Sequence, residues 1–388
     1  MMKIAKYLST AAIGVAASIL LVAGPASAET LSFGYIGPMT GGGAPWGIAG
    51  AEGARIAIDD VNAKGGIKVG GKTYQVKLIA YDDKYTAADD VAVYNRLVHQ
   101  DDVKFLVVLT GTGTLALKDN IEADKVVAFT ATYTDKALTE KTKYLFRVYA
   151  PPRLYMEPVV KWMKQNLPGK NVVLLNPNDE VGWDGEETAK KGFTEGGYDL
   201  RASERFERNL KDFQPLLTRI IAMQPDIIDL GATAPATSGI IVRQARELGY
   251  KKLFVKTGGA ALKEILDAAG REAAEGTINL LWADRTQSGF RRVAEEYKKA
   301  KGQEPNEMIV PIYDAVRVTL AAIEKAGTVE DTDKVAATVK EVFPYTTLQG
   351  DQVTLGGFNS NGTPREIESI SYIGAIKNGE IAVIGKAK

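Results

Sequence analysis

The sequence predicts an α/β protein made of two doubly wound, Rossmann-like lobes that are joined by more than one segment. Short apolar runs alternate with helical patterns almost from end to end, which is typical of parallel strands connected by right-handed crossovers. Most runs are apolar without alternation, as expected for strands covered by helices on both faces. The series stops at Tyr149-Ala150-Pro151-Pro152 and a second one starts at Val172, so we expect one lobe to follow the other.

The first series begins with a buried strand, a glycine-rich turn that carries one tryptophan, and an amphipathic helix closed by Gly65-Gly66. The turn and the closing glycines are typical boundaries of a helix. The expected strands of this series are Leu31–Ile36, Thr73–Tyr81, Lys104–Leu109 and Val126–Phe129, and the expected helices are Trp46–Lys64 and Ala87–Gln100.

The second series has the same alternation, and the chain changes character after it. Its expected strands are Asn171–Asn176, Asp226–Leu230, Lys252–Lys256 and Thr277–Leu281, and its expected helices are Asp212–Met223 and Thr237–Leu248. Two adjacent helices follow, Gly289–Lys301 and Ile309–Ala326, with no strand between them. From Phe343 onward we expect short β segments with turns at Gly350-Asp351, Gly356-Gly357 and Asn361-Gly362. This change predicts that the chain crosses back to the first lobe.

Residues 1–28 have the pattern of a secretory signal peptide. Lys3 and Lys6 give a positive start, Ala11–Gly24 is apolar, and Ala26-Ser27-Ala28 is a small-residue cleavage site. The apolar run has about 14 residues, whereas a membrane-spanning helix needs roughly 20. We therefore expect cleavage after Ala28 and a mature protein that diffuses in the periplasm. A lipid anchor is not expected, because the leader contains no cysteine.

Composition and charge argue against several classes of function. The chain has 48 basic and 48 acidic residues, and the leader carries two lysines and no acid, so the mature net charge is −2. A nearly neutral, mixed surface gives no case for nucleic acid or an anionic membrane as partner. Without cysteine there is no thiol chemistry, and one histidine without cysteine cannot supply the ligands of a zinc site. A serine triad would have to use His99, the single histidine, which falls late in the expected helix Ala87–Gln100, where a surface role is expected. We expect no enzyme and no metal.

Glycine-rich turns after two of the strands raise the alternative of a nucleotide site. They lie at residues 41–47 and 111–113, and neither has the G-x-G-x-x-G spacing or the G-x-x-x-x-G-K-[ST] pattern. Export to the periplasm also argues against a nucleotide cofactor, so we expect no cofactor. What remains is the general ability of backbone N–H groups at a helix start to attract anions.

Three loops follow the carboxyl ends of expected strands, where ligands collect in open α/β sheets. They are 39–47 with Trp46, 109–114 with Gly111, Thr112 and Gly113, and 130–134 with Thr132, Tyr133 and Thr134. A tryptophan between proline and glycine at a helix start is expected to face a ligand, with local packing as the alternative. The threonines offer hydroxyl donors, or they only cap helices.

Five segments carry a family resemblance: IGPMTG…WG…GAEGARIAIDDVNAKGGI, VKLIAYDD, YLFRV, QPDIIDLGA with IVRQARELG, and YDAVRVTLAAIEKAG. Through them, the mature chain resembles the periplasmic leucine/isoleucine/valine-binding proteins of ABC importers. The resemblance implies a type I periplasmic binding fold with three hinge crossings, a ligand cleft between the lobes, and delivery of the ligand to a permease. It implies lobes of 29–148 plus 281–366 and of 149–280 plus 367–388.

Carried over residue by residue, the family's pocket matches this chain unevenly. The family's aromatic residue of the first glycine turn falls on Trp46, its carboxylate-binding loop on Gly111-Thr112-Gly113, and its next threonine on Thr134. The tyrosine and glutamate that hold the ligand's α-ammonium fall on Thr233 and Gly258. The resemblance therefore keeps a carboxylate clamp and loses the anionic partner of an ammonium group, which would be costly to bury alone.

We therefore expect a ligand that is an acid without an α-amino group, aromatic or otherwise apolar. The nearby aromatic residues are Trp46, Tyr133, Tyr155 and Trp183, and stacking on one ring contributes roughly 0.5–1.5 kcal/mol beyond burial of area. Arg153 is a candidate second partner for the acid, or a solvated surface residue. The alternatives are a branched-chain or other hydrophobic amino acid as ligand, and a sensor that signals to a regulatory partner. We expect a monomer.

Overall fold

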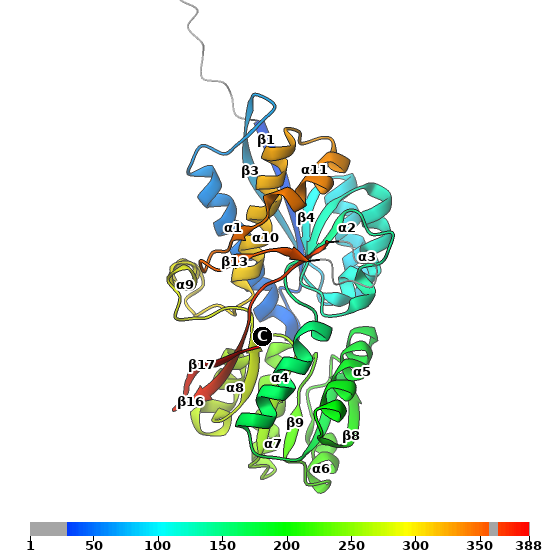
Figure 1. The fold of residues 1–388 in the computed structure, drawn as a ribbon, viewed down its shortest axis with the longest axis vertical. Helices are drawn as coiled ribbons and strands as arrows, with labels where there is room; N and C mark the ends of the chain where they lie inside the picture. Colours follow the sequence, from blue (N-terminus) through cyan, green and yellow to red (C-terminus); the bar gives the residue numbers. More distant parts are fainter. Residues whose placement is uncertain (1–28, 357–363, 388) are drawn as a thin grey trace, which may run out of the picture.

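The computed structural model describes residues 29–356 and 364–387, and it has two lobes, each built on one mainly parallel sheet. Figure 1 shows the first lobe above and the second lobe below, with the C-terminal segment crossing between them. The expected signal peptide and the expected turn at Asn361-Gly362 lie outside the described residues. No helix in the described ranges is long and apolar enough to cross a membrane.

The first lobe has an eight-stranded sheet in the order β14-β15-β6-β5-β4-β1-β3-β2. All neighbouring strands are parallel except β2 and β14, which pair antiparallel at the two edges. Its strands are β1 (Glu29–Gly37), β2 (Ile67–Val69), β3 (Lys72–Asp82), β4 (Phe105–Val108), β5 (Val127–Thr130), β6 (Leu145–Arg147), β14 (Leu355–Gly356) and β15 (Glu366–Ile367). Its helices are α1 (Ala44–Asn62), α2 (Ala87–His99), α3 (Gly111–Asp124), α9 (Ser288–Lys301), α10 (Ile309–Ala326) and α11 (Thr332–Thr338), with short helices at Gly41–Gly43, Asp135–Ala137 and Val339–Val342.

The second lobe has a seven-stranded sheet in the order β17-β16-β11-β10-β9-β7-β8. The antiparallel pairs are β11–β16 and β16–β17, so the C-terminal hairpin closes one edge of a parallel sheet. Its strands are β7 (Asn171–Pro177), β8 (Asp199–Phe206), β9 (Ile227–Asp229), β10 (Leu253–Lys256), β11 (Ile278–Leu281), β16 (Ser371–Lys377) and β17 (Glu380–Ala387). Its helices are α4 (Pro152–Asn166), α5 (Glu180–Glu195), α6 (Gln214–Ala222), α7 (Pro235–Glu247) and α8 (Leu262–Ala274). A small two-stranded sheet of β12 (Tyr345–Thr346) and β13 (Gln352–Val353) precedes the last crossing.

The chain passes between the two sheets three times. The crossings are the segments 148–151 after β6, 282–287 after β11, and 368–370 after β15. The fold is therefore two doubly wound lobes on a three-segment hinge, as the resemblance implied. The carboxyl ends of the parallel strands of both sheets lead into the loops that meet between the lobes.

Helix α1 shows how the first lobe holds the glycine turn in place. Its buried face, with Ile56, Ile58 and Val61, packs on the sheet and on α10. A Cβ atom added at Gly53 would lie 2.3 Å from the carbonyl oxygen of Ile309, so only glycine lets α1 and α10 approach this closely. The hydroxyl of Tyr35 on β1 donates to the carbonyl of Gly47, 2.8 Å away, and fixes the start of the helix.

All eight expected strands and all six expected helices are present, with bounds that differ by one or two residues at most ends. Three strands of the two large sheets were not predicted: β2, β6 and β8. The first two have only three residues each, and β8 mixes charged and apolar residues on an edge of the sheet instead of forming an apolar run. The tail does not consist of short segments only, since β16 and β17 form a long hairpin that joins the second sheet.

Candidate functional site

A small cavity of about 40 Å³ lies between the lobes, and small-molecule sites occur preferentially at such interfaces between domains. Both lobes and two hinge crossings contribute to its wall. Among the described residues that line it, five are aromatic and none is charged. The lining residues are Trp46, Tyr85, Leu109, Thr110, Gly111, Ala131, Tyr133, Tyr149, Val181, Ala232, Gly258, Gly259, Trp282 and Met308.

The first turn of α3 forms one wall of the cavity. Thr110 caps this helix, because its hydroxyl oxygen accepts a hydrogen bond of 3.0 Å from the N–H of Gly113. The N–H groups of Gly111 and Thr112 precede that of Gly113 in the first turn and have no acceptor within the helix. This end of the helix therefore carries partial positive charge. The hydroxyl oxygens of Thr112 and Thr132 are buried without a hydrogen-bond partner among the described residues. This wall therefore offers donors that suit an anion.

Tyr133 occupies the part of the cavity next to Gly258. A Cβ atom at Gly258 would lie 2.7 Å from Cε2 of Tyr133 and 2.8 Å from the carbonyl oxygen of Gly231. The tyrosine ring therefore takes the space that a side chain at position 258 would need. Its hydroxyl has no partner among the described residues, and burial raises the pKa of Tyr133, so the phenol stays neutral.

Trp46 spans the gap between the lobes. It starts from the first turn of α1, and its indole N–H donates to the carbonyl oxygen of Ala260 in the second lobe, 2.7 Å away. A Cβ atom at Gly259, where φ is +59°, would lie 2.4 Å from Cζ2 of the indole. The Lys256 ammonium lies 5.8 Å from the ring centroid. The ring of Trp46 therefore lines the cavity and also packs on the opposite lobe.

Two hinge aromatic residues, Tyr149 and Trp282, complete the cavity, and neither was predicted from the sequence. Their rings stack with centroids 4.4 Å apart and planes at 17°. Tyr149 donates to the carbonyl of Ala131, while the indole N–H of Trp282 is buried and without a partner among the described residues. The signal that could have found them is an aromatic residue in each of the first two crossings.

The sequence model of a family described as periplasmic binding protein matches residues 30–365. The chain belongs to this family. It is 29% identical to the Leu/Ile/Val-binding protein BraC3 of Rhizobium johnstonii over 334 residues, which cover 86% of this chain and 89% of that protein. Among solved structures it is similar to a leucine-binding protein LivK of Thermotoga maritima, with 23% identity, a TM-score of 0.79, and coverage of 92% and 99%.

A second similar solved structure holds an aromatic acid. It is a solute-binding protein of an ABC transporter from Rhodopseudomonas palustris BisB5, in complex with 3,4-dihydroxybenzoic acid. The present chain is 23% identical to that protein, with a TM-score of 0.78, and the match covers 92% of this chain and 97% of that chain. At such identities the likeness concerns the fold alone.

Of the twelve residues predicted for the site, four line the cavity of this periplasmic binding protein: Trp46, Gly111, Tyr133 and Gly258. Thr112 and Thr132 adjoin lining residues, and Gly113 uses its N–H inside α3. The remaining polar side chains are engaged elsewhere. The Thr134 hydroxyl accepts from the N–H of Lys136, Tyr155 donates to the carbonyl of Thr257 at 2.9 Å, and Thr233 contacts the carbonyl of Leu175 at 3.5 Å.

Arg153 and Trp183 lie outside the cavity lining. Arg153 donates from Nη2 to both carboxylate oxygens of Glu366, at 2.9 and 2.8 Å, and thus connects α4 to β15 beside the hinge. Trp183 is 42% exposed, and its indole N–H donates to Oδ1 of Asn178, 3.0 Å away. Neither side chain contacts the cavity in this arrangement of the lobes.

Two buried charges lie behind the cavity loops of the second lobe. Asp229 accepts from the N–H of Thr257 at 3.0 Å and from its hydroxyl at 2.8 Å, and burial raises its pKa. Lys256 donates to the carbonyls of Gly231 and Thr233, at 2.7 and 2.6 Å. Burial lowers the pKa of Lys256 to about 7. Both groups hold loop backbone, so the cavity itself keeps an uncharged surface.

Proposed function

We propose that this protein is the periplasmic receptor of an ABC importer, and that it binds a small aromatic or otherwise apolar carboxylate without an α-amino group. The proposal depends mainly on the cavity lining, which combines five aromatic rings with unpaired polar donors and no charged side chain among the described residues. Such a lining suits a flat, apolar molecule with one anionic group.

The ligand's carboxylate would lie against the first turn of α3. The free N–H groups of Gly111 and Thr112 and the buried hydroxyls of Thr112 and Thr132 are donors, and hydrogen bonds to an ionised acceptor are the stronger ones. The ring would lie among Trp46, Tyr149 and Trp282. Because these residues come from both lobes and the hinge, the ligand contacts both sides and favours the closed state by its differential affinity.

An ordinary amino acid fits this cavity less well. Its ammonium group would need an anionic partner, and an unpaired buried charge is strongly unfavourable. Position 258, which the resemblance assigns to the family's glutamate, is glycine, and Tyr133 fills the adjoining space. Asp229 is already bonded to Thr257 and lies behind the lining. We therefore propose that the protein does not use an ammonium site.

A hydrophobic amino acid is the second candidate ligand, because the curated relative BraC3, at 29% identity, is named a Leu/Ile/Val-binding protein. The related fold from Rhodopseudomonas palustris holds 3,4-dihydroxybenzoic acid, so the fold accommodates either class of ligand. The residues of the cavity, not the fold, therefore support the acid. We further propose that the protein carries out no reaction on its ligand.

Titration of the purified protein would test the proposal. Benzoate, 4-hydroxybenzoate and trans-cinnamate are compared with leucine, isoleucine and valine, by calorimetry and by the fluorescence of Trp46 and Trp282. Binding of an aromatic acid without binding of leucine is the expected result, and tight leucine binding without acid binding contradicts it. Mass spectrometry of small molecules released from freshly purified, denatured protein identifies any ligand that the titration omits.

A pair of variants locates the carboxylate. Thr112→Val removes a donor at the first turn of α3, and we expect it to weaken acid binding about ten- to hundredfold, as for a lost hydrogen bond to a charged group. Thr218→Val on α6 is the matched control. This threonine is exposed, its hydroxyl donates to the carbonyl of Gln214 within its own helix, and it does not line the cavity. Equal affinities of the two variants would place the carboxylate elsewhere.

A further inference from the structure

The carbonyl oxygen of Ala260 accepts hydrogen bonds from two residues of the opposite lobe. One donor is the indole N–H of Trp46, at 2.7 Å, and the other is the side-chain amide of Asn306, at 3.1 Å. Ala260 precedes α8 in the second lobe, whereas Trp46 and Asn306 belong to α1 and to the loop before α10 in the first lobe. Two donors from one lobe thus converge on one acceptor of the other.

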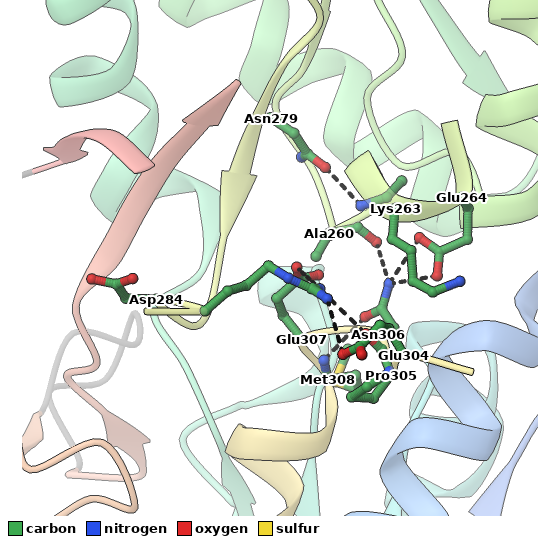
Figure 2. Close-up of polar contacts among 12 residues, drawn as sticks. Ala260, Lys263, Glu264, Asn279, Asp284, Glu304, Pro305, Asn306, Glu307 and Met308 are labelled. Atoms are coloured by element: carbon green, nitrogen blue, oxygen red, sulfur yellow. Dashed lines mark hydrogen bonds and ion pairs between the residues drawn. The ribbon is translucent and has the colours of Figure 1, made fainter. Parts of the chain in front are cut away.

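Asn306 is built into this contact. Its side chain is 2% exposed, and its amide nitrogen also lies 3.2 and 3.1 Å from the two carboxyl oxygens of Glu264 on α8. Figure 2 shows Asn306 between Ala260 and Glu264. Its carbonyl oxygen accepts from the N–H of Met308, 3.0 Å away, and Met308 lines the cavity. Asn306 itself does not line the cavity, so any effect on ligand acts through other residues.

Glu264 is the second acceptor of the Asn306 amide group, after Ala260, and it has no cationic partner among the described residues. The charge of Glu307 acts on Glu264. Glu307 is fully buried and receives a hydrogen bond of 2.7 Å from Arg285 in the second hinge crossing. Burial, followed by the charge of Glu307, raises the pKa of Glu264 to about 7. The groups that face Glu264 are Glu304, Glu307, Lys256, Lys263, Arg285 and Tyr297.

The three cations among these groups are already engaged by other partners. Arg285 bonds Glu307, Lys263 pairs with Asp267 on the outer side of α8, and Lys256 donates to the carbonyls of Gly231 and Thr233. Glu264 itself therefore has no ion pair, and the charge of Glu307, although Glu307 is paired with Arg285, still raises the pKa of Glu264. When the lobes are closed, a proton on Glu264 removes this repulsion.

We infer that Asn306 and Glu264 are positioning residues for ligand capture: they hold Ala260 and Trp46 in the closed arrangement, and Glu264 takes up a proton as the lobes close. The inference rests on the lobe closure in the proposed function and not on the identity of the ligand. Opening separates Glu264 from Glu307 and returns it to water. A group with a higher pKa in the closed form stabilises closure at low pH, and this contribution is lost as the pH rises through about 7.

The distance between the lobes measures closure directly and needs no ligand. The chain has no cysteine, so two can be introduced for dyes, at exposed Asp119 on α3 and exposed Lys191 on α5. Single-molecule energy transfer then reports the ratio of closed to open molecules. A pKa that changes from the ordinary value to about 7 on closure predicts an increase of about tenfold in this ratio from pH 8 to pH 6.

Three variants separate the inference from a general loss of structure. Glu264→Gln keeps the shape without the titration, so we expect a closed fraction that is high and independent of pH. Asn306→Ala lowers the closed fraction at every pH, while circular dichroism shows an intact fold. Glu272→Gln, an exposed glutamate of the same helix, behaves as the unmodified protein.

Two outcomes overturn the inference. One is an interlobe distance that does not depend on pH in the unmodified protein, and the other is a dependence that persists in Glu264→Gln. A parallel titration with 4-hydroxybenzoate keeps the two proposals apart. If the acid does not bind while closure still follows the pH, the proposed ligand is wrong and the positioning role stands.

Discussion

The rings of Tyr149 and Trp282 stack at 4.4 Å between centroids, and each belongs to a different crossing of the hinge. Both rings line the cavity between the lobes, and both also line a second small space of about 30 Å³ on the hinge side. That space is bounded by Asp314, Tyr345 and residues of the third crossing, including Ser369. The stacked pair therefore separates two spaces and joins two hinge segments.

The first prediction concerns the length of the ligand. Trp282→Ala joins the two spaces. We expect weaker binding of benzoate, because it loses a stacking partner that contributes about 0.5–1.5 kcal/mol beyond the burial of surface area. We expect relatively better binding of 4-phenylbutyrate, because this longer acid can extend into the second space. Calorimetry with both acids measures the ratio of affinities. Trp282→Phe is the control, because it keeps an aromatic ring stacked on Tyr149. If the ratio of the two affinities were the same in both variants, the stacked pair would not separate the two spaces.

A thermal melt should accompany this comparison. Removing a buried tryptophan side chain typically lowers the free energy of unfolding by about 3–5 kcal/mol. Binding is therefore measured well below the midpoint of unfolding of the variant, so that a lost affinity is not mistaken for lost structure.

The second prediction uses two glycines with positive φ. Gly259→Ala places a Cβ atom 2.4 Å from the indole of Trp46, and we expect it to prevent the docking of Trp46 on the second lobe and to abolish tight binding. Gly249→Ala has a comparable backbone strain, since φ is +88°, but its Cβ would meet no atom within 4 Å. Small-angle scattering at saturating ligand distinguishes them. A compact Gly259→Ala protein would show that the indole contact is not required for closure.

How much of this site could be read from the sequence depends on where each residue lies. Trp46 and Gly111 follow strands of the first lobe, and the end of a strand marks the ligand edge of such a sheet without knowledge of the other lobe. Tyr149 and Trp282 are different, because their pairing exists only once two crossings far apart in sequence lie side by side. Ala260 and Asn306 were also missed, since a backbone acceptor and a lone asparagine carry no pattern.

The fold was more predictable than the site for a physical reason. Strands such as β4 and β5 are covered on both faces, so all their residues except Thr130 are apolar and the run is visible in the sequence. The edge strand β8 has one open side and mixes Arg201, Glu204 and Arg205 into its run. Arg153, expected to face a ligand or solvent, instead neutralises Glu366 from another crossing, and such long-range pairs leave no local signal.

The third prediction concerns the charges at the hinge. Glu366 on β15 is 1% exposed and pairs with Arg153 of the second lobe at 2.8 Å and with fully buried Arg147 at 3.4 Å. Glu366→Gln leaves two guanidinium groups without this carboxylate. We expect the free energy of unfolding to fall by about 3–5 kcal/mol, as when one partner of a buried ion pair is removed.

Denaturant unfolding checks this value, with Glu29→Gln as the comparison. Glu29 forms an exposed pair with Lys72, at 2.7 Å, and exposed pairs contribute only about 0–1 kcal/mol. If both variants lost the same small amount, the hinge pair would be no more than a surface contact.

The last prediction concerns two buried carboxyl groups behind the first turn of α3. Asp83 and Asp90 are both fully buried, and a Cβ atom at Gly113 would lie 2.2 Å from Oδ1 of Asp90, so this carboxyl sits directly against the helix. Burial raises the pKa of both groups, and in Asp90 the charge of Asp83 raises it further. The native protein therefore holds a proton in this pair at a pH at which the unfolded chain has released it.

Groups with raised pKa values stabilise the native state when protonated, and this stabilisation is lost as the pH rises from the unfolded value of about 4 through about 6 for Asp83 and about 9 for Asp90. We expect the free energy of unfolding to fall over this range. Asp90→Asn keeps a donor toward Asp83 and cannot ionise, so its unfolding free energy should exceed that of the unmodified protein at the alkaline end by more than about 1 kcal/mol. Exposed Asp119→Asn should follow the unmodified protein. If the free energy of unfolding of all three proteins changed with pH in the same way, this pair would not hold the proton. A charged carboxylate would then lie behind the first turn of α3, whose donors face the ligand in the proposed function.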